Sequence, residues 1–292
     1  MTSFRESAAF LKECHLRAGV RAAFAASAMW LSSAAGAADT FLPDSQGAAQ
    51  SCLDASSSSI SVRYDDQDRH FYAESGERFF AGELRFGSGV SSAEDRAQLA
   101  FIESGEDLEA VPLGPVNRWG LVPAWIIRTD EHGSSLLQAE LLGEGGALFA
   151  PQHSSGRCAH ILRGLERDAR KADVGLWREN APQVVFSTEA PKTFNGMSGY
   201  YVIARGRVVS LGKTRTTRYL NFGNYWKTDF TATLKVSDEE AFNAALAQSG
   251  WDVDALTGRA VELRGTVQEK DGPHIALHHP EQLVVLESAP LN

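Results

Sequence analysis

Short apolar runs separated by turn residues dominate the chain after residue 59. Residues 60–86 contain such runs with Ser75-Gly76 between them, a pattern typical of paired strands. Strand-like segments return at residues 107–113 and 122–128. We therefore expect this part of the chain to be built mainly from β-strands.

Helical patterns are interspersed with these strands. Ser91 and Glu94 form a capping box, and residues 97–102 follow at roughly helical spacing. Residues 136–142 and 158–172 are two further predicted helices. The apolar face of the last helix consists of Ile161, Leu162, Leu165 and Ala169. Glu166 and Arg170 lie four residues apart on it and can pair, and Gly175 ends the helix before Leu176-Trp177.

A second strand-rich region follows residue 199. Strand patterns cover residues 200–211, 218–222, 230–236, 259–269, 274–279 and 283–286, and Ser237 with Glu240 caps one helix through Ala247. Five or six short strands with one helix predict a small OB-like barrel at residues 200–288.

Two segments are identified by their composition: one lies between the two strand-rich regions and the other precedes the first of them. Pro182, Pro191, Asn195-Gly196 and Ser198-Gly199 predict a linker at residues 181–199. Residues 39–59 are rich in Ala, Ser and Gly and predict a flexible arm.

The first 38 residues have the pattern of a signal peptide. Four basic residues precede an Ala-rich apolar stretch at 22–31, and Ala35-Gly36-Ala37 provides a cleavage signal, cut near Ala37 or Ala38. The alternative is an amphipathic helix that the mature chain keeps. Beyond this segment no run of 18 apolar residues occurs, so we expect no membrane span in the mature chain and a periplasmic or secreted location.

Charge is distributed unevenly over the exported part. Residues 39–180 carry 13 Lys and Arg against 23 Asp and Glu, a net charge of −10, whereas residues 181–292 carry 11 against 12. Because cations that neutralise phosphates supply most non-specific affinity for nucleic acid, the acidic first region argues against a nuclease.

Three cysteines occur, and Cys14 belongs to the predicted signal peptide. Cys52 and Cys158 would remain as a pair in an oxidising compartment, where a disulfide is the expected state. Two free thiols are the alternative.

Several segments of residues 60–180 resemble the thermonuclease (staphylococcal nuclease) family. They are Asp66-Gln67-Asp68, Phe79-Phe80-Ala81-Gly82, Asn117-Arg118-Trp119-Gly120, residues 137–142, and residues 166–169 leading to Gly175-Leu176-Trp177. The next region is similar to a domain appended to alphaproteobacterial members, in residues 219–223, Trp226 and residues 229–231. The resemblance implies a calcium-dependent nuclease barrel with packed helices. The expected fold is thus mainly β with α, with two small OB-like β-barrel domains.

The catalytic positions that the resemblance implies are largely replaced. Asp68 matches the first metal carboxylate. The two phosphate-clamping arginine positions are occupied by Phe79 and Leu121, the second metal position by Leu84, and the general-base position by Gly87. Phe and Leu supply neither the carboxylates nor the guanidinium groups that this chemistry needs. A slipped register using Glu83 or Glu77 with Arg85 is the alternative, although a one-residue slip in a strand reverses the side chain's direction.

The second region offers a possible nucleic-acid site. Lys213, Arg215 and Arg218 lie near a predicted hairpin loop, Arg205 and Arg207 lie on the preceding strand, and aromatic residues cluster from Tyr200 to Trp226. In the alternative interpretation the aromatics fill the barrel and the cations pair with acids.

Other polar groups give weaker signals. Asp65 and Asp66 beside Asp68 are typical of a solvated turn, and the histidines at 153, 160, 278 and 279 lack the spacing of a zinc site. Ser154 and Ser155 have no recognisable catalytic partners.

From the sequence we therefore expect an exported thermonuclease-family homologue that is catalytically degenerate and acts as a binding or scaffold module for an unidentified protein partner. No cofactor is expected. The alternatives are a divergent metal-dependent nuclease, which would use Ca²⁺, and a single-strand nucleic-acid binder acting through the second region.

Overall fold

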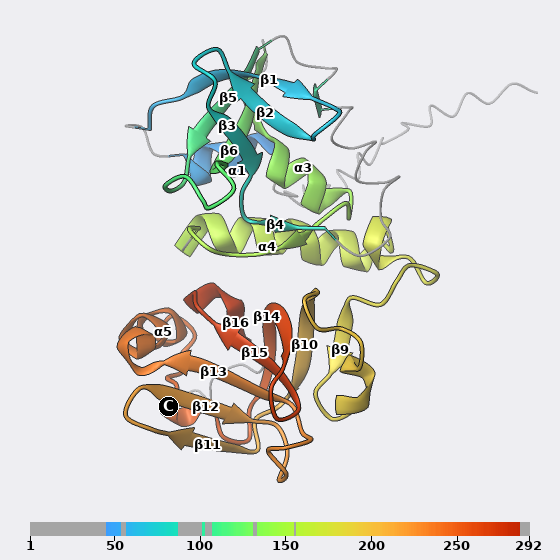
Figure 1. Ribbon diagram of the computed structural model, residues 1–292, viewed down its shortest axis with the longest axis vertical. Coiled ribbons are helices and arrows are strands. Elements are labelled where there is room, and N and C mark those ends of the chain that lie inside the picture. Colours follow the sequence, from blue (N-terminus) through green and yellow to red (C-terminus); the bar gives the residue numbers. More distant parts are fainter. Residues whose placement is uncertain are drawn as a thin grey trace, which may run out of the picture. The chain divides into compact units, whose positions relative to one another are not determined.

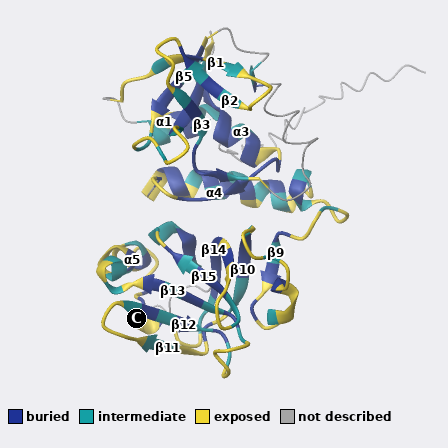
Figure 2. Cartoon of the chain, in the orientation of Figure 1, coloured by how far each residue is buried: buried dark blue, intermediate teal, exposed yellow. Residues whose placement is uncertain are grey.

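The computed structural model describes residues 45–53, 57–86, 101–102, 107–130, 133–154 and 156–286. The predicted signal peptide, the Ser91–Glu94 capping box and Gly87 lie outside these residues. Phe41–Asn292 forms one compact unit, which contains two large hydrophobic cores. We call the part around the first core the first lobe (residues 45–180) and the part around the second core the second lobe (residues 181–286). Buried residues gather inside each lobe and exposed ones lie mainly in loops (Figure 2).

The first lobe contains a closed five-stranded barrel (Figure 1). The barrel strands are β1 (Ile60–Asp65), β2 (His70–Ala73), β3 (Arg78–Ala81), β5 (Asp107–Pro112) and β6 (Val122–Asp130). Antiparallel pairs join β1 to β2, β2 to β3, β1 to β5, and β5 to β6. A parallel pair between β3 and β6 closes the ring. β7 (Gly133–Leu136) pairs antiparallel with β6, and β4 (Leu84–Arg85) pairs separately with β8 (Leu148–Phe149).

Helices cover this barrel: α1 (Ser45–Cys52), α3 (Leu137–Gly143) and α4 (Gly156–Lys171), followed by the 3-10 helix η1 (Gly175–Trp177). The predicted face of α4 is confirmed, since Leu162 and Ala169 are buried and Ile161 and Leu165 pack against the first core. The predicted Glu166–Arg170 pair is present at 3.8 Å. Gln138 of α3 is fully buried and bonds to the backbone of Ile126 and Ala124 in β6, which fixes the helix on the barrel.

The prediction of a flexible arm at 39–59 was wrong for residues 45–52. These residues form α1, where Ala48 and Ala49 are buried in the first core. The predicted disulfide is confirmed, since Cys52 at the end of α1 is bonded to Cys158 of α4. Small side chains that read as flexible in sequence allow α1 to pack closely.

The second lobe contains a ring with the same strand order. β10 (Tyr201–Arg207) continues through residues 208–209 into β11 (Ser210–Lys213), and the Val209 N–H donates to the Asn221 carbonyl across this break. The first half pairs with β14 (Ala260–Glu269) and the second half with β12 (Thr217–Asn221). β12 also pairs with β13 (Thr231–Lys235), and a parallel pair joins β13 to β15 (Pro273–Leu277). The antiparallel β14–β15 pair completes the ring.

Short elements decorate this second ring. They are β9 (Val185–Ser187), η2 (Pro191–Phe194), η3 (Val236–Asp238), α5 (Glu239–Ala247), η4 (Asp254–Leu256), η5 (Pro280–Gln282) and β16 (Leu283–Val285). The segment expected as a linker therefore contains structure, because β9 pairs with β10 and the Phe194 ring lies 5.1 Å from Phe186 and 4.9 Å from Phe230. A mainly β chain with helices, containing a closed five-stranded barrel, agrees with the expected class.

Two glycines, one after the end of α3 and one after the end of α4, lie in direct contact. Gly145 and Gly175 both have positive φ, 65° and 56°. A Cβ at Gly175 would lie 2.2 Å from the Gly145 carbonyl oxygen, and a Cβ at Gly145 would lie 2.4 Å from that of Val174. The Leu176 N–H donates to the Gly145 carbonyl at 2.8 Å. Only glycine fits both positions, because the two backbones are in direct contact.

Candidate functional site

A cavity of about 920 Å³ lies at the side of the first barrel. Residues from the β1–β2 turn, β2, β3, β4, the start of β6 and the loops at 115–121 and 152–153 line it. Its large exposed hydrophobic residues are Phe86 (42%), Val116 (60%) and Trp119 (62%). An exposed apolar cluster beside a cavity is typical of a site that binds a ligand or partner.

The loop that carries Trp119 is held by several polar contacts. The Asn117 side-chain oxygen accepts from the N–H groups of Trp119 and Leu121. Arg78 donates to the Trp119 carbonyl at 2.8 Å, and the Arg118 guanidinium lies 4.1 Å from the centre of the Trp119 ring. The exposed indole is therefore presented by an ordered loop.

Asp68 lines this cavity and contacts two neighbouring side chains. Its carboxylate accepts from the Tyr72 hydroxyl, and the His70 ring nitrogen Nδ1 lies 3.5 Å away. The hydrogen bond from Tyr72 and the charge of His70 lower the pKa of Asp68. Asp65 accepts from the Gln67 N–H, as in an Asx turn. Among the described residues, no group of three or more His, Cys, Asp or Glu is placed to hold a metal ion.

The positions that the resemblance marked as catalytic fall in different environments. Phe79 lies opposite Phe71 in the barrel and is 1% exposed, and Leu84 is also buried in the first core. Leu121 lines the cavity, as Asp68 does. The structure therefore brings together Asp68 and Leu121 at the cavity, while Phe79 and Leu84 are packing residues.

Glu83 has a structural task that its sequence context does not indicate. It is 1% exposed, has a φ of 63°, and accepts hydrogen bonds from the N–H groups of Gln152, His153 and Ser154 and from the Ser154 hydroxyl. These donors occupy its carboxylate, so in this arrangement it holds the 152–154 loop and not a metal.

The other groups of the slipped-register alternative do not converge. Glu77 accepts from Ser75 in the β2–β3 turn and does not line the cavity. Arg85 does line the cavity, and its Nη1 donates to the Leu84 carbonyl at 2.8 Å.

The candidate nucleic-acid residues of the second lobe are mostly paired with acids. Lys213 lies 2.9 Å from Glu239, and Arg218, 6% exposed, contacts both Glu239 and Asp254. Arg205 pairs with Glu262 and Arg207 donates to the Gly258 carbonyl. Arg215 is exposed and lines a shallow cavity with Lys235. Phe222 is buried, whereas Tyr225 and Trp226 are exposed, so the aromatics do not form one surface.

The remaining weak candidates are scattered. His160 is exposed on α4, His153 lines the first cavity, and Ser155 lies outside the described residues. His278 and His279 line a second, smaller cavity.

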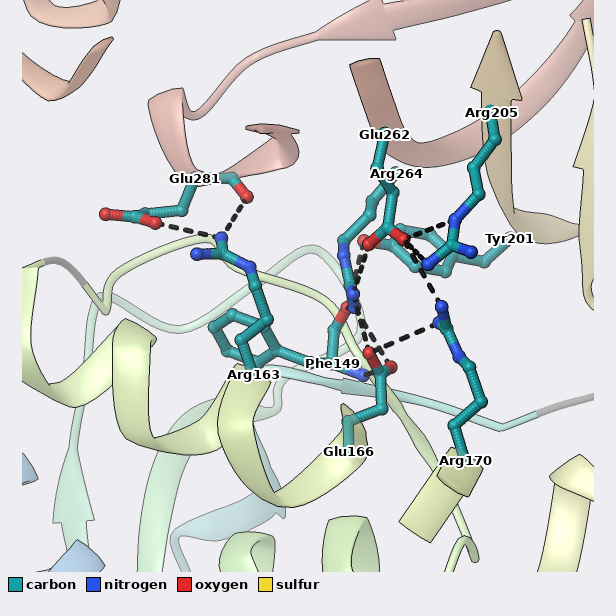
Figure 3. A network of polar contacts seen from close by, with 9 residues as sticks. All are labelled: Phe149, Arg163, Glu166, Arg170, Tyr201, Arg205, Glu262, Arg264 and Glu281. Atoms are coloured by element: carbon teal, nitrogen blue, oxygen red, sulfur yellow. Dashed lines mark hydrogen bonds and ion pairs between the residues drawn. The ribbon is translucent and has the colours of Figure 1, made fainter. Parts of the chain in front are cut away.

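A buried ion network connects the lobes, and the sequence patterns indicated only its Glu166–Arg170 pair (Figure 3). Arg264 of β14 forms two hydrogen bonds to Glu166 of α4, at 2.9 and 2.6 Å, and one to Glu262 at 2.6 Å. Arg205 and Arg170 also contact Glu262. Burial alone would raise the pKa of Glu262, but these three arginines lower it to about 2.

Two backbone contacts anchor this network in the first lobe. Phe149 donates its N–H to Glu166 and accepts from Arg264 through its carbonyl. Nearby, Arg163 of α4 bonds to the carboxylate and carbonyl of Glu281. Since α4 also packs on α1 and α3, it connects the first core to the second lobe.

None of the helices in the described part of the chain is long and apolar enough to cross a membrane. Comparison with models of known protein families and with curated proteins finds no match for this chain.

Proposed function

We propose that this chain is an exported, thermonuclease-like protein that has lost phosphodiesterase chemistry and binds a ligand at the cavity of its first barrel. The observation that carries the proposal is the cluster of Phe86, Val116 and Trp119 around that cavity. Solvent-exposed aromatic and aliphatic groups cost free energy unless something covers them, so a ligand gains affinity by burying them.

The fold supports the thermonuclease-like part of this proposal. In each lobe the ring follows the order first, second, third, fifth and fourth strand, with a parallel pair between the third and fifth. α5 lies between the third and fourth strands of the second ring. This arrangement fits an OB-like barrel, whose side and loops commonly bind ligands. The Cys52–Cys158 disulfide fits an oxidising compartment and thus export.

The loss of catalysis follows from the chemistry of the replaced positions. Hydrolysis of a phosphodiester needs a metal held by several oxygens and a cation to balance the charge that builds on phosphorus. Phe79 and Leu84 are core residues, and Glu83 is occupied by four donors. Asp68 alone cannot hold the metal.

A nuclease assay tests this half of the proposal. Protein purified after export would be incubated with plasmid and single-stranded DNA in the presence of Ca²⁺, beside Asp68→Ala. We expect no cleavage above background from either protein. Robust cleavage that Asp68→Ala abolishes would overturn the proposal in favour of a divergent nuclease.

A neutral apolar dye tests the binding half. Nile red fluorescence should rise on addition of the protein and fall at least about fivefold for Trp119→Ala, because the indole provides much of the exposed apolar surface. Trp226→Ala removes a tryptophan that is similarly exposed (60%) in the second lobe and serves as the matched control. An equal loss of Nile red fluorescence in both variants, or no Nile red binding to the parent chain, would contradict a ligand site at the first barrel.

A further inference from the structure

The cavity of the first barrel adjoins a second cavity through two shared residues. Arg85 and Gln152 line both. The second cavity, of about 460 Å³, is formed by the loop at 150–152 and by residues of the second lobe, including Tyr201, His278 and His279. Arg85 therefore lies where a mainly apolar cavity meets a polar one.

Among the described residues, the lining of the second cavity contains a basic side chain and no acidic one. None of its lining residues in the described chain is an Asp or a Glu, and Arg85 is the arginine among them. The charges of Glu83 and Glu281 act on His279, but the Glu83 carboxylate accepts from the donors of residues 152–154 and the Glu281 carboxylate pairs with Arg163. An anion that enters this cavity would thus meet a cation without a competing free carboxylate.

Hydrogen-bond donors in the second cavity are also fixed in place. The Nδ1 of His279 accepts from the Glu281 N–H, so the neutral ring carries its proton on Nε2 and can donate there. Burial lowers the pKa of His279, which keeps the ring neutral. The Gln282 side chain holds the N–H groups of His278 and His279 at 2.7 and 2.8 Å, which orders this loop.

The first cavity has a more apolar lining. Phe86, Val116 and Trp119 are its large exposed apolar residues, and Asp68 and Arg69 line this cavity but not the second one. The acid Asp68 in the first cavity therefore has a basic neighbour beside it, and Arg85 adds a guanidinium group where the two cavities meet.

We propose that these neighbouring cavities bind an amphiphilic anion, with its acid group on Arg85 and its apolar part against Phe86, Val116 and Trp119. This inference rests on the proposed function, since it names the ligand class of the same site. The bond from Nη1 to the Leu84 carbonyl orients the Arg85 guanidinium, and its planar array of donors suits a carboxylate or similar acid group. The combined size suits a small organic molecule.

Two ligands with the same chain and opposite charge test this assignment. Sodium decanoate and decyltrimethylammonium would be titrated by calorimetry, below their micellar concentrations, into protein purified after export. We expect decanoate to bind at least about tenfold more tightly, since a hydrogen bond to a charged group contributes about one tenfold step in affinity or more.

Variants of two arginines locate the charge preference. Arg85→Gln should weaken decanoate binding about tenfold and leave decyltrimethylammonium within about twofold. Arg63→Gln changes net charge equally on the exposed side of β1, away from both cavities, and should leave both affinities within about twofold. Circular dichroism would confirm that each variant is folded.

The outcomes separate this inference from the proposed function. Equal or tighter binding of the cation, or an Arg85→Gln variant that binds decanoate normally, would overturn the anion assignment while Trp119-dependent Nile red binding still supported the site. Failure of Nile red and both decyl compounds to bind would contradict the proposed function as well.

Discussion

Arg264 and Glu166 form a two-point ion pair between the lobes, and their side chains are 2% and 1% exposed. One residue belongs to β14 of the second lobe and the other to α4, which packs on the first core. The pair therefore couples the stability of the first lobe to that of the second.

Glu166→Gln should lower the free energy of unfolding by about 3 kcal/mol, because it leaves the buried Arg264 with one carboxylate partner in place of two. Urea denaturation measures the change. Glu179→Gln, at an exposed position after η1, is the matched control and should stay within about 0.5 kcal/mol of the parent.

A double variant checks that the effect comes from the pair. Glu166→Leu with Arg264→Met should be less destabilised than the sum of the two single variants, because neither partner is then left charged and buried. Additive single effects would mean that the two side chains act independently.

Stability should fall in acid through Glu262. Its pKa in the folded chain is about 2, below the ordinary value of 4.5, because Arg264, Arg170 and Arg205 outweigh the effect of burial. Because this pKa is lower in the folded chain than in the unfolded chain, the ionised Glu262 carboxylate stabilises the fold, and it does so fully above about pH 4.5. This contribution, on the order of 3 kcal/mol, is lost as the pH falls toward 2.

Urea midpoints measured from pH 6 to pH 2 would follow this loss. Glu262→Gln should be less stable at pH 6 and should show a shallower decline below pH 4.5. A decline as steep as that of the parent chain would assign the acid sensitivity to other carboxylates.

Removing the Cys52–Cys158 bond should cost about 4 kcal/mol, since it closes a long loop, with a sequence separation of 106 residues. Cys52→Ser with Cys158→Ser should show this loss in chemical denaturation, and dithiothreitol should shift the parent chain in the same direction. Unfolding that is unaffected by either treatment would show that α1 is held by packing of Ala48 and Ala49 alone.

Glu83→Gln should release the loop at 152–154. The amide has one acceptor oxygen where the carboxylate has two, so some of the loop's donors lose their partner, at a cost of about 2 kcal/mol. Hydrogen exchange at Gln152, His153 and Ser154 should become faster, and exchange in the Asn117–Leu121 turn should stay unchanged.

Glu83→Gly separates the carboxylate from the backbone conformation. Glycine accepts the positive φ of 63° without strain but has no acceptor group. If residues 152–154 exchange their amide hydrogens as slowly in this variant as in the parent chain, the carboxylate does not anchor the loop.

Periodicity in the sequence predicted most strands and helices because it reports which side chains point into the same core. It identified the α4 face around Leu162 and the strands of both rings. It could not identify α1, because an Ala- and Ser-rich segment has weak preference of its own and is held by the first core and Cys158.

Long-range polar contacts were the part that the sequence could not predict. Arg264 has the pattern of an ordinary strand residue, and nothing in its neighbours indicates that α4 brings Glu166 to it. Glu83 likewise depends on a loop about 70 residues later. The segment around Trp119 resembles a family motif, but the exposure of its indole, on which the proposed site depends, is set by the fold of the loop.

The contact between Gly145 and Gly175 limits how this chain could change over time. A methyl group at either position would force two backbones apart, whatever reaction or ligand the barrel served. Catalytic side chains can be exchanged one at a time without such a collision. The Gly175-Leu176-Trp177 segment therefore reports a steric requirement of folding and is silent about activity.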